Sequence, residues 1–318
     1  MPGQTGQMRA WRWIRRSLTA VSLGAVGYFF AIALAEHLQA TEGACLTPDP
    51  LTAVAVACFA LAVAVSALLW RSILNRSARA ESLGRLDAVE VYIAAWLLKY
   101  LPGKAWSYAY RAATARARGI ELATLLNSFA LETLFLLLAS TVPAIPIVLA
   151  VALTDSAISI QMLSPLLLLL PVLALLHRPT TERLTEFLYR FLRQPKPPKS
   201  ARMSGRFLAK MQAGYLVPRV LNGVAFVLIT HSLYGVTVDM WAPLVAFYML
   251  AGILGSLAFF APSGIGVREG VLVGLCIHYF NLEQAALLAI ITRIYNLLAD
   301  LALAAVLVSC RARRWMNE

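Results

Sequence analysis

The stretch IELATLLNSFALETLFLLLASTVPAIPIVLAVAL, residues 120–153, contains two glutamates and no lysine or arginine. A helix needs about 20 apolar residues to cross the hydrocarbon of a bilayer, and this run is longer than that. It lacks the strict alternation of apolar and polar residues that a membrane β-strand shows. Pro143 and Pro146 predict a kink. We therefore predict an all-α integral membrane protein.

The composition of the whole chain agrees with this class. Of its 318 residues, 60% are hydrophobic and 14% are charged, whereas a soluble domain carries about a quarter charged residues. The net charge of +12 is explained by lysine and arginine in cytoplasmic loops, so no nucleic-acid partner is expected. Cys58 and Cys276 lie inside apolar runs, and no disulfide is predicted among the four cysteines.

The hydropathy pattern predicts about eight transmembrane helices in one domain, residues 1–318. They are expected at residues 18–35, 51–70, 120–153, 158–176, 213–234, 242–261, 265–281 and 284–310. This arrangement puts every basic loop on one side, which predicts a multi-pass inner-membrane protein with both termini cytoplasmic. A cleaved signal peptide is the alternative for the first helix.

A basic segment, residues 178–212, separates two loosely similar halves, residues 1–177 and 213–318. Within it, apolar residues recur at helical spacing from Leu184 to Leu192. This pattern predicts an amphipathic helix at the membrane surface.

The segment 88–118 contains an apolar run that is too short to cross a bilayer, and basic residues flank it. We expect a re-entrant pair of half-helices that turns at Pro102–Gly103 and returns to the cytoplasmic side. Such backbone is tolerated at membrane depth only inside protein or beside a wet cavity. An amphipathic helical pair on the inner surface is the alternative. Lys104 and Arg111 lie close to the turn, and cytoplasmic anchoring is the simpler role for them.

The motif PSGIGVRE, residues 262–269, interrupts another apolar run. Pro262 ends one helix, Gly264 and Gly266 permit a tight turn, and a new helix begins near Val267. We expect this broken-helix turn at the cytoplasmic end of a span. Free N–H groups at a helix start favour an anion, and an arginine follows directly.

Two adjacent charges end that motif, Arg268 and Glu269. Neighbours on a helix point about 100° apart, so at least one of them needs a partner elsewhere. The simpler alternative is that Glu269 caps its own helix and that Arg268 anchors the span at the headgroups.

Polar residues also occur inside the predicted spans. Glu132 lies about 18 Å beyond Ile120, counted at 1.5 Å per residue, and charges at such depth usually face the protein interior. Arg293, Asn296 and Asp300 share one face of the last helix. A structural ion pair and a substrate or proton role are both open for these four residues. Arg219 is expected near a span entrance, with its charge reaching the interface.

The two turn motifs, KYLPGKAWSYAYR (99–111) and APSGIGVRE (261–269), together with RIYNLLAD (293–300), resemble the lysylphosphatidylglycerol synthase transmembrane-region family, also called flippase-like domain proteins. The resemblance covers nearly the whole chain. The positions that match the family's recurrent ones are Pro102, Gly103, Arg111, Pro262, Gly264, Gly266, Arg268, Glu269 and Asp300. Ser263 stands where family members often have glycine.

The resemblance implies an eight-span bundle with re-entrant helices that moves lipids between leaflets. The lipids would be aminoacylated phosphatidylglycerol or a polyprenyl-linked or hopanoid-type lipid. Lipid synthesis is not carried over. Arg111, Arg268 and the glycine-turn amides would bind a lipid phosphate, and Glu132, Glu269 and Asp300 would balance these charges or carry a proton.

Other classes of function remain open at this point. A membrane-embedded transferase acting on lipids is one, although the external loops are short for a catalytic acid or base. A non-transporting partner of envelope lipid biosynthesis enzymes is another. The sequence has no phosphate-binding loop of the ATPase type and no Cys/His metal cluster, so we expect no enzyme activity, cofactor or metal.

Overall fold

A computed structural model describes residues 49–77, 83–100, 105–154, 183, 186–187, 190, 204–258, 264 and 266–316. Eight α-helices and two 3-10 helices lie in this part of the chain. They are α2 (Pro50–Ser77), α3 (Arg85–Leu97), η1 (Leu98–Tyr100), α4 (Ala105–Arg116), α5 (Leu122–Thr154), α8 (Gly205–Tyr234), η4 (Val238–Met240), α9 (Trp241–Leu257), α10 (Val267–Cys276) and α11 (Leu282–Met316).

Five described segments are long and apolar enough to cross a membrane, which confirms a multi-pass helical membrane protein. They are Pro50–Arg76, Leu122–Val151, Gly205–Tyr234, Val238–Leu257 and Leu282–Cys310. Each corresponds to a predicted span, and α8 begins eight residues earlier than the predicted 213. The predicted spans 18–35 and 158–176 lie outside the described residues.

The predicted span 265–281 is wrong. In its place α10 has only 10 residues, or about 15 Å of helix, which is half of what the hydrocarbon requires. The helix ends at Cys276, and residues 277–279 form a turn. Asn281 and Gln284 then exchange backbone-to-side-chain hydrogen bonds that start α11.

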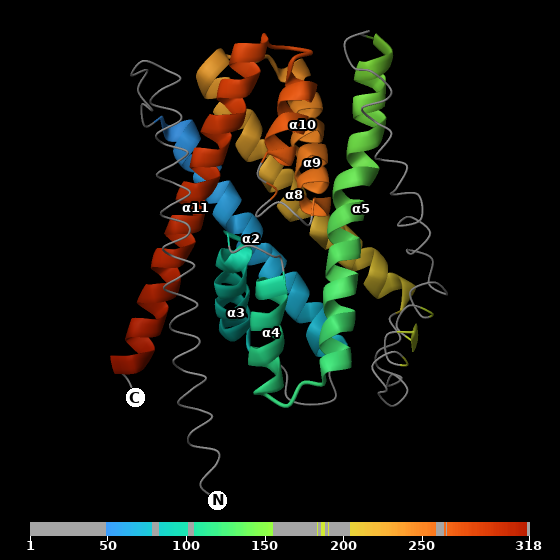
Figure 1. The fold of residues 1–318 in the computed structure, drawn as a ribbon, viewed down its shortest axis with the longest axis vertical. Helices are drawn as coiled ribbons and strands as arrows, with labels where there is room; N and C mark the ends of the chain where they lie inside the picture. Colours follow the sequence, from blue (N-terminus) through green and yellow to red (C-terminus); the bar gives the residue numbers. More distant parts are fainter. Residues whose placement is uncertain are drawn as a thin grey trace, which may run out of the picture.

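Two helical hairpins occupy opposite halves of the bundle (Figure 1). The first consists of α3, η1 and α4, and it starts and ends at the end of the bundle where α2 finishes and α5 begins. The second consists of α9 and α10, and it starts and ends at the other end, where α8 finishes and α11 begins. The described helices of both hairpins end or begin near the middle of the molecule, at the end of η1, the start of α4, the end of α9 and the start of α10 (Figure 1).

The long helices hold this arrangement together. α2 and α8 pack against each other, α5 packs against α8 and α9, and α11 contacts both α3 and α10. α5 continues through Pro143 and Pro146 without a break, so the two prolines do not end the helix. Its buried face includes Phe135 and Leu138, each 1% exposed.

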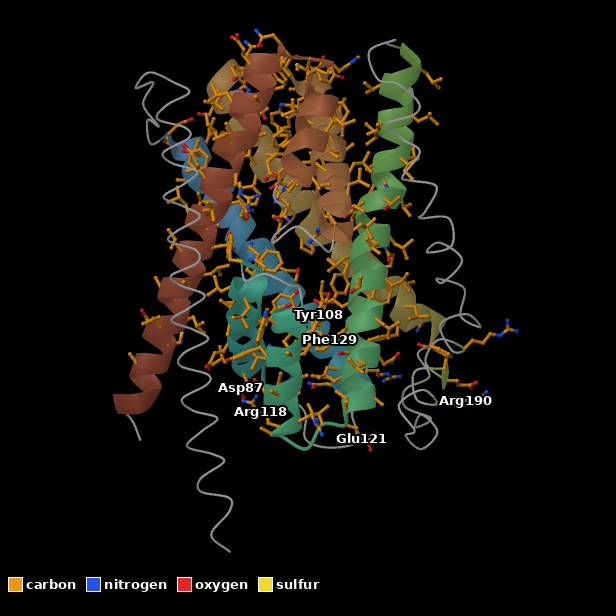
Figure 2. All side chains as sticks on the ribbon, in the orientation of Figure 1. Asp87, Tyr108, Arg118, Glu121, Phe129 and Arg190 are labelled. Atoms are coloured by element: carbon orange, nitrogen blue, oxygen red, sulfur yellow. The ribbon has the colours of Figure 1, made fainter. Side chains whose placement is uncertain are left out.

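Little of the basic segment 178–212 is described. Residues 183, 186, 187 and 190 are helical and exposed, and the exposed side chains include Phe187 and Arg190 (Figure 2). The predicted surface helix therefore agrees with the structure at these four positions.

Candidate functional site

The first charged pair of the interior joins α4 to α5. The Nη1 atom of Arg111 lies 2.6 Å from Oε2 of Glu132, and the hydroxyl of Tyr92 donates to the other carboxylate oxygen at 2.6 Å. Arg111 is 6% exposed and Glu132 is 3% exposed. The carboxylate therefore has two donors and balances the guanidinium in a dry setting, where an unpaired charge would be costly.

Aromatic rings enclose the same guanidinium. The rings of Phe129, Tyr92, Trp70 and Tyr108 lie 4.4, 5.0, 5.1 and 5.3 Å from the central carbon of Arg111. Tyr108 and Phe129 face each other from α4 and α5 (Figure 2). Ring faces attract a cation at such distances. The structure places Arg111 in an aromatic cage against Glu132, and its predicted role in binding a lipid phosphate stays a prediction.

The second cluster surrounds Asp300 on α11. Its carboxylate accepts hydrogen bonds from the Trp96 indole at 2.8 Å and from the Tyr100 hydroxyl, and the Lys99 ammonium lies at 2.7 Å. Lys99 also stacks on the Trp96 ring at 4.0 Å. Asp300 is 2% exposed.

The third cluster lies at the start of α10. One carboxylate oxygen of Glu269 accepts the backbone N–H of Gly266 at 2.8 Å, and the other pairs with Arg293 of α11. Glu269 therefore caps its own helix, as the simpler alternative held, and it also joins α10 to α11. The Gly266 amide is consequently not free for an anion.

Arg268 points to a different helix. Its guanidinium donates to the Tyr248 hydroxyl of α9, and its central carbon lies 4.7 Å from the Tyr248 ring. The prediction that at least one of the adjacent charges has a partner elsewhere is confirmed, since Arg268 contacts Tyr248 and Glu269 pairs with Arg293. No carboxylate pairs with Arg268 among the described residues.

Close backbone packing joins α9 to α10. A Cβ atom added to Gly255 would lie 2.8 Å from Cβ of Arg268, and one added to Gly264 would lie 2.7 Å from the Gly255 carbonyl oxygen. Gly264 and Gly266 have φ angles of 71° and 82°, which glycine adopts without strain. The predicted glycine turn is confirmed at these two positions.

The depth of this turn differs from the prediction. Glu269 pairs with Arg293, which follows Leu282, the first residue of α11, by 11 positions or about 17 Å. The turn therefore lies inside the bundle, whereas the sequence placed it at the cytoplasmic end. The predicted position is wrong because α10, with 10 residues, is too short to be the full span predicted there.

Four predicted site residues, Pro102, Gly103, Lys104 and Pro262, lie outside the described residues. Asn296 is half-buried on α11, between Arg293 and Asp300. In the described part of the chain no group of three His, Cys, Asp or Glu side chains could hold a metal ion.

The aromatic partners of the charged residues were not predicted. Tyr92, Trp96 and Tyr100 follow one another at spacings of four, which puts them on one face of α3 and η1. Their polar tips reach Glu132 and Asp300. This spacing of Tyr and Trp in a short apolar run was the signal that could have found them.

Comparison with known protein families gives a match over most of the chain. The family model described as lysylphosphatidylglycerol synthase TM region matches residues 14–304. No curated protein matches the chain. The matched region contains both hairpins and all three charged clusters, and the chain therefore belongs to the lysylphosphatidylglycerol synthase transmembrane-region family.

Proposed function

We propose that this protein is a flippase-like lipid translocase, which moves the polar headgroup of an anionic or lipid-linked envelope lipid between the leaflets of the inner membrane. The observation that carries this proposal is a pair of hairpins that enter from opposite ends of the bundle (Figure 1), each held to α11 by an ion pair in the interior. Membership of the lysylphosphatidylglycerol synthase transmembrane-region family supports it.

The hairpins suit this task because helices that stop at half depth are stable in a bilayer only inside protein or beside a wet cavity. Broken helices of this kind build the central sites of many transporters. We propose that α3 and α4 form a re-entrant pair from one leaflet and that α9 and α10 form one from the other. A headgroup would pass between the tips while its acyl chains stay in lipid.

The exposed arginines support an orientation. Arg76 lies in the last turn of α2, Arg116 ends α4 and Arg206 lies in the first turn of α8, all at one end of the bundle. Basic residues collect on the cytoplasmic side. The first hairpin would therefore open toward the cytoplasm, with both termini on that side, and the second toward the periplasm.

Two ion pairs would act as latches in this scheme. Lys99–Asp300 holds the first hairpin against α11, and Glu269–Arg293 holds the second. Release of one latch at a time would open the centre to one leaflet at a time. Arg268, which has no described carboxylate partner, would bind the phosphate of the headgroup. The scheme needs no covalent step, and enzymes of envelope lipid biosynthesis would supply the lipid.

A leaflet-exchange assay tests the proposal. Purified protein is reconstituted into liposomes with fluorescent anionic, aminoacylated or polyprenyl-linked lipids, and a membrane-impermeant quencher reports how much lipid reaches the outer leaflet. We expect faster exchange of at least one lipid than in protein-free liposomes, and slower exchange with Asp300→Asn. Exchange at the protein-free rate for the whole panel would contradict the proposal.

A further inference from the structure

The described interior has more cations than acids. Six of its cations are buried or half-buried, and three of them pair with a carboxylate, as Lys99–Asp300, Arg111–Glu132 and Arg293–Glu269. Arg71 donates to the Leu83 carbonyl. The remaining two are Arg219 and Arg268, which have no carboxylate partner among the described residues. The three charged clusters, taken with Arg219 and Arg268, therefore carry a surplus of two cations over carboxylates, which an apolar surrounding disfavours unless an anion is present.

Arg219 lies at the centre of α8. It is 14 positions after Gly205 and 15 before Tyr234, or about 21 and 23 Å from the two ends of the helix. The prediction that Arg219 lies near a span entrance, with its charge at the interface, is therefore wrong, because α8 starts eight residues before the predicted span. Its Nε atom is buried without a hydrogen-bond partner.

Arg219 belongs to a polar stripe on α8. Gln212, Tyr215 and Arg219 are spaced by three and four residues, so they share one face. Each has a buried polar side-chain atom with no hydrogen-bond partner. Tyr215 is 0% exposed, and its ring stacks on Phe135 at 5.6 Å. Buried polar groups nearly always have partners, so three such atoms on one face indicate that something polar binds there.

The stripe connects the two hairpins. Tyr215 stacks on Phe135 of α5, the helix that carries Glu132. Phe226 of α8 stacks on Tyr248 of α9 at 5.0 Å, and Tyr248 is the hydrogen-bond partner of Arg268. The two arginines without a carboxylate partner therefore lie on α8 and α10, which both pack against α9, and their charges act on each other. Like charges repel, so an anion between them would be stabilising.

We propose that Arg219 and Arg268, with the hydroxyl of Tyr215 one helical turn before Arg219, bind a phosphate-type anion at the middle of the bundle. Each guanidinium offers paired N–H donors that match phosphate oxygens, and the charge of the anion would offset the surplus. This inference deepens the proposed function and rests on it for a lipid as the source of the phosphate.

Binding measurements on the purified full-length protein test the site. The probes are inorganic phosphate and nanodiscs that contain phosphatidylglycerol, with phosphatidylcholine nanodiscs as the neutral reference. We expect Arg219→Gln to weaken binding of the phosphate probe by at least about tenfold. Arg206→Gln is the matched control, since Arg206 is exposed on the same helix, and it should bind as wild type does.

Tyr215→Phe separates binding from folding. It keeps the ring on Phe135 and removes a hydroxyl without a described partner, so the melting temperature should not fall. We expect weaker phosphate binding with unchanged melting. Wild-type affinity for both probes in Arg219→Gln, or no binding of either probe by the wild type, would overturn the site.

The two probes distinguish the source of the phosphate. Selective binding of phosphatidylglycerol supports a lipid headgroup, whereas equal binding of inorganic phosphate supports the site with a free anion as its ligand. Lipid exchange separates the two proposals. Binding lost in Arg219→Gln, with no exchange by the wild type, would keep the site and reject the translocase. Lipid exchange by the wild type, together with unaltered phosphate binding in Arg219→Gln, would keep the translocase and reject the site.

Discussion

Arg293 and Asp300 lie seven residues apart on one face of α11, and each pairs with a different hairpin. Arg293 pairs with Glu269 of α10, and Asp300 pairs with Lys99 of η1. Seven residues are about two helical turns, or about 11 Å. A single straight helix therefore fixes the separation between two hairpin tips that come from opposite ends of the bundle.

This arrangement predicts a large effect for Asp300→Asn. The amide keeps the size of the side chain but leaves the Lys99 ammonium without its counter-charge. Breaking one partner of a buried pair typically costs about 3–5 kcal/mol. We expect a clear fall in the melting temperature of the purified protein, measured by tryptophan fluorescence.

Asp87→Asn is the control for that experiment. The Asp87 and Arg118 side chains are 34% and 37% exposed and lie 3.9 Å apart. Exposed pairs contribute about 0–1 kcal/mol, so this change should barely alter melting. Equal effects of the two variants on the melting temperature would show that the Lys99–Asp300 pair does not hold the first hairpin against α11.

The Arg111–Glu132 pair predicts strong coupling between its members. Glu132→Leu leaves a guanidinium uncompensated among aromatic rings, and Arg111→Met leaves a bare carboxylate. The double change removes both charges and keeps apolar volume, which is often neutral or even stabilising for buried pairs. We expect each single variant to unfold more easily than the double variant in denaturant titrations.

Lipid exchange by the double variant then decides between the two roles of Glu132. Full exchange would assign the pair to structure alone. Loss of exchange in a variant that melts like the wild type would give the pair a role in transport. Additive stability effects would contradict the coupling.

The membrane class and five of the spans follow from the sequence because long apolar runs such as 120–153 have one stable outcome in a bilayer. The turn at Gly264 and Gly266 follows because proline and glycine act on the local backbone. The hydropathy pattern gave a wrong span at α10, because a short helix and the turn after it together have the length of a transmembrane helix.

The partners of the charged residues could not be predicted from the sequence. The hydrogen bond between Trp96 and Asp300 joins residues 204 positions apart, and no local pattern contains that information. The centre of α8 was misjudged for a related reason. The depth of Arg219 depends on where its helix begins, and helix ends are the least certain feature of a hydropathy reading.

Three glycines of the second hairpin predict graded effects on stability. At Gly264→Ala the new Cβ would meet the Gly255 carbonyl at 2.7 Å, in a backbone with φ of 71°. Gly266 has a φ of 82° but open space around it, so Gly266→Ala should lower the free energy of unfolding only by the backbone strain, about 1–2 kcal/mol. Gly270→Ala lies within α10, also in open space, and should be neutral or stabilising by up to about 1 kcal/mol.

Melting temperatures of the three glycine variants should therefore rise in the order Gly264→Ala, Gly266→Ala, Gly270→Ala. A Gly264→Ala variant as stable as wild type would show that α9 and α10 do not pack as closely as the structure has them.

The opposed hairpins predict a labelling pattern. In a cysteine-free background, Leu86→Cys and Ala117→Cys lie at the two ends of the first hairpin, while Thr237→Cys and Glu283→Cys flank the second. An impermeant maleimide should label the first two only from the cytoplasmic side and the last two only from the periplasmic side. Leu86→Cys and Ala117→Cys labelled from opposite sides would mean that α3 or α4 crosses the membrane.

Arg268→Lys tests whether the arginine binds the headgroup or only anchors a helix. Lysine keeps the charge but loses the planar group that grips two phosphate oxygens. Lysine also lacks the guanidinium group that now donates a hydrogen bond to the Tyr248 hydroxyl. We expect weaker binding of phosphatidylglycerol nanodiscs, with normal expression and melting, because no carboxylate among the described residues loses its partner.

Arg268→Gln should weaken that binding further, because it removes the charge, and the additional loss should shrink at high salt if water reaches the site. The anchoring role predicts the opposite for the lysine variant, since lysine and arginine both extend to the headgroups and substitute freely there. Wild-type affinity in Arg268→Lys would therefore exclude Arg268 from the anion site and leave Arg219 as the cation to test.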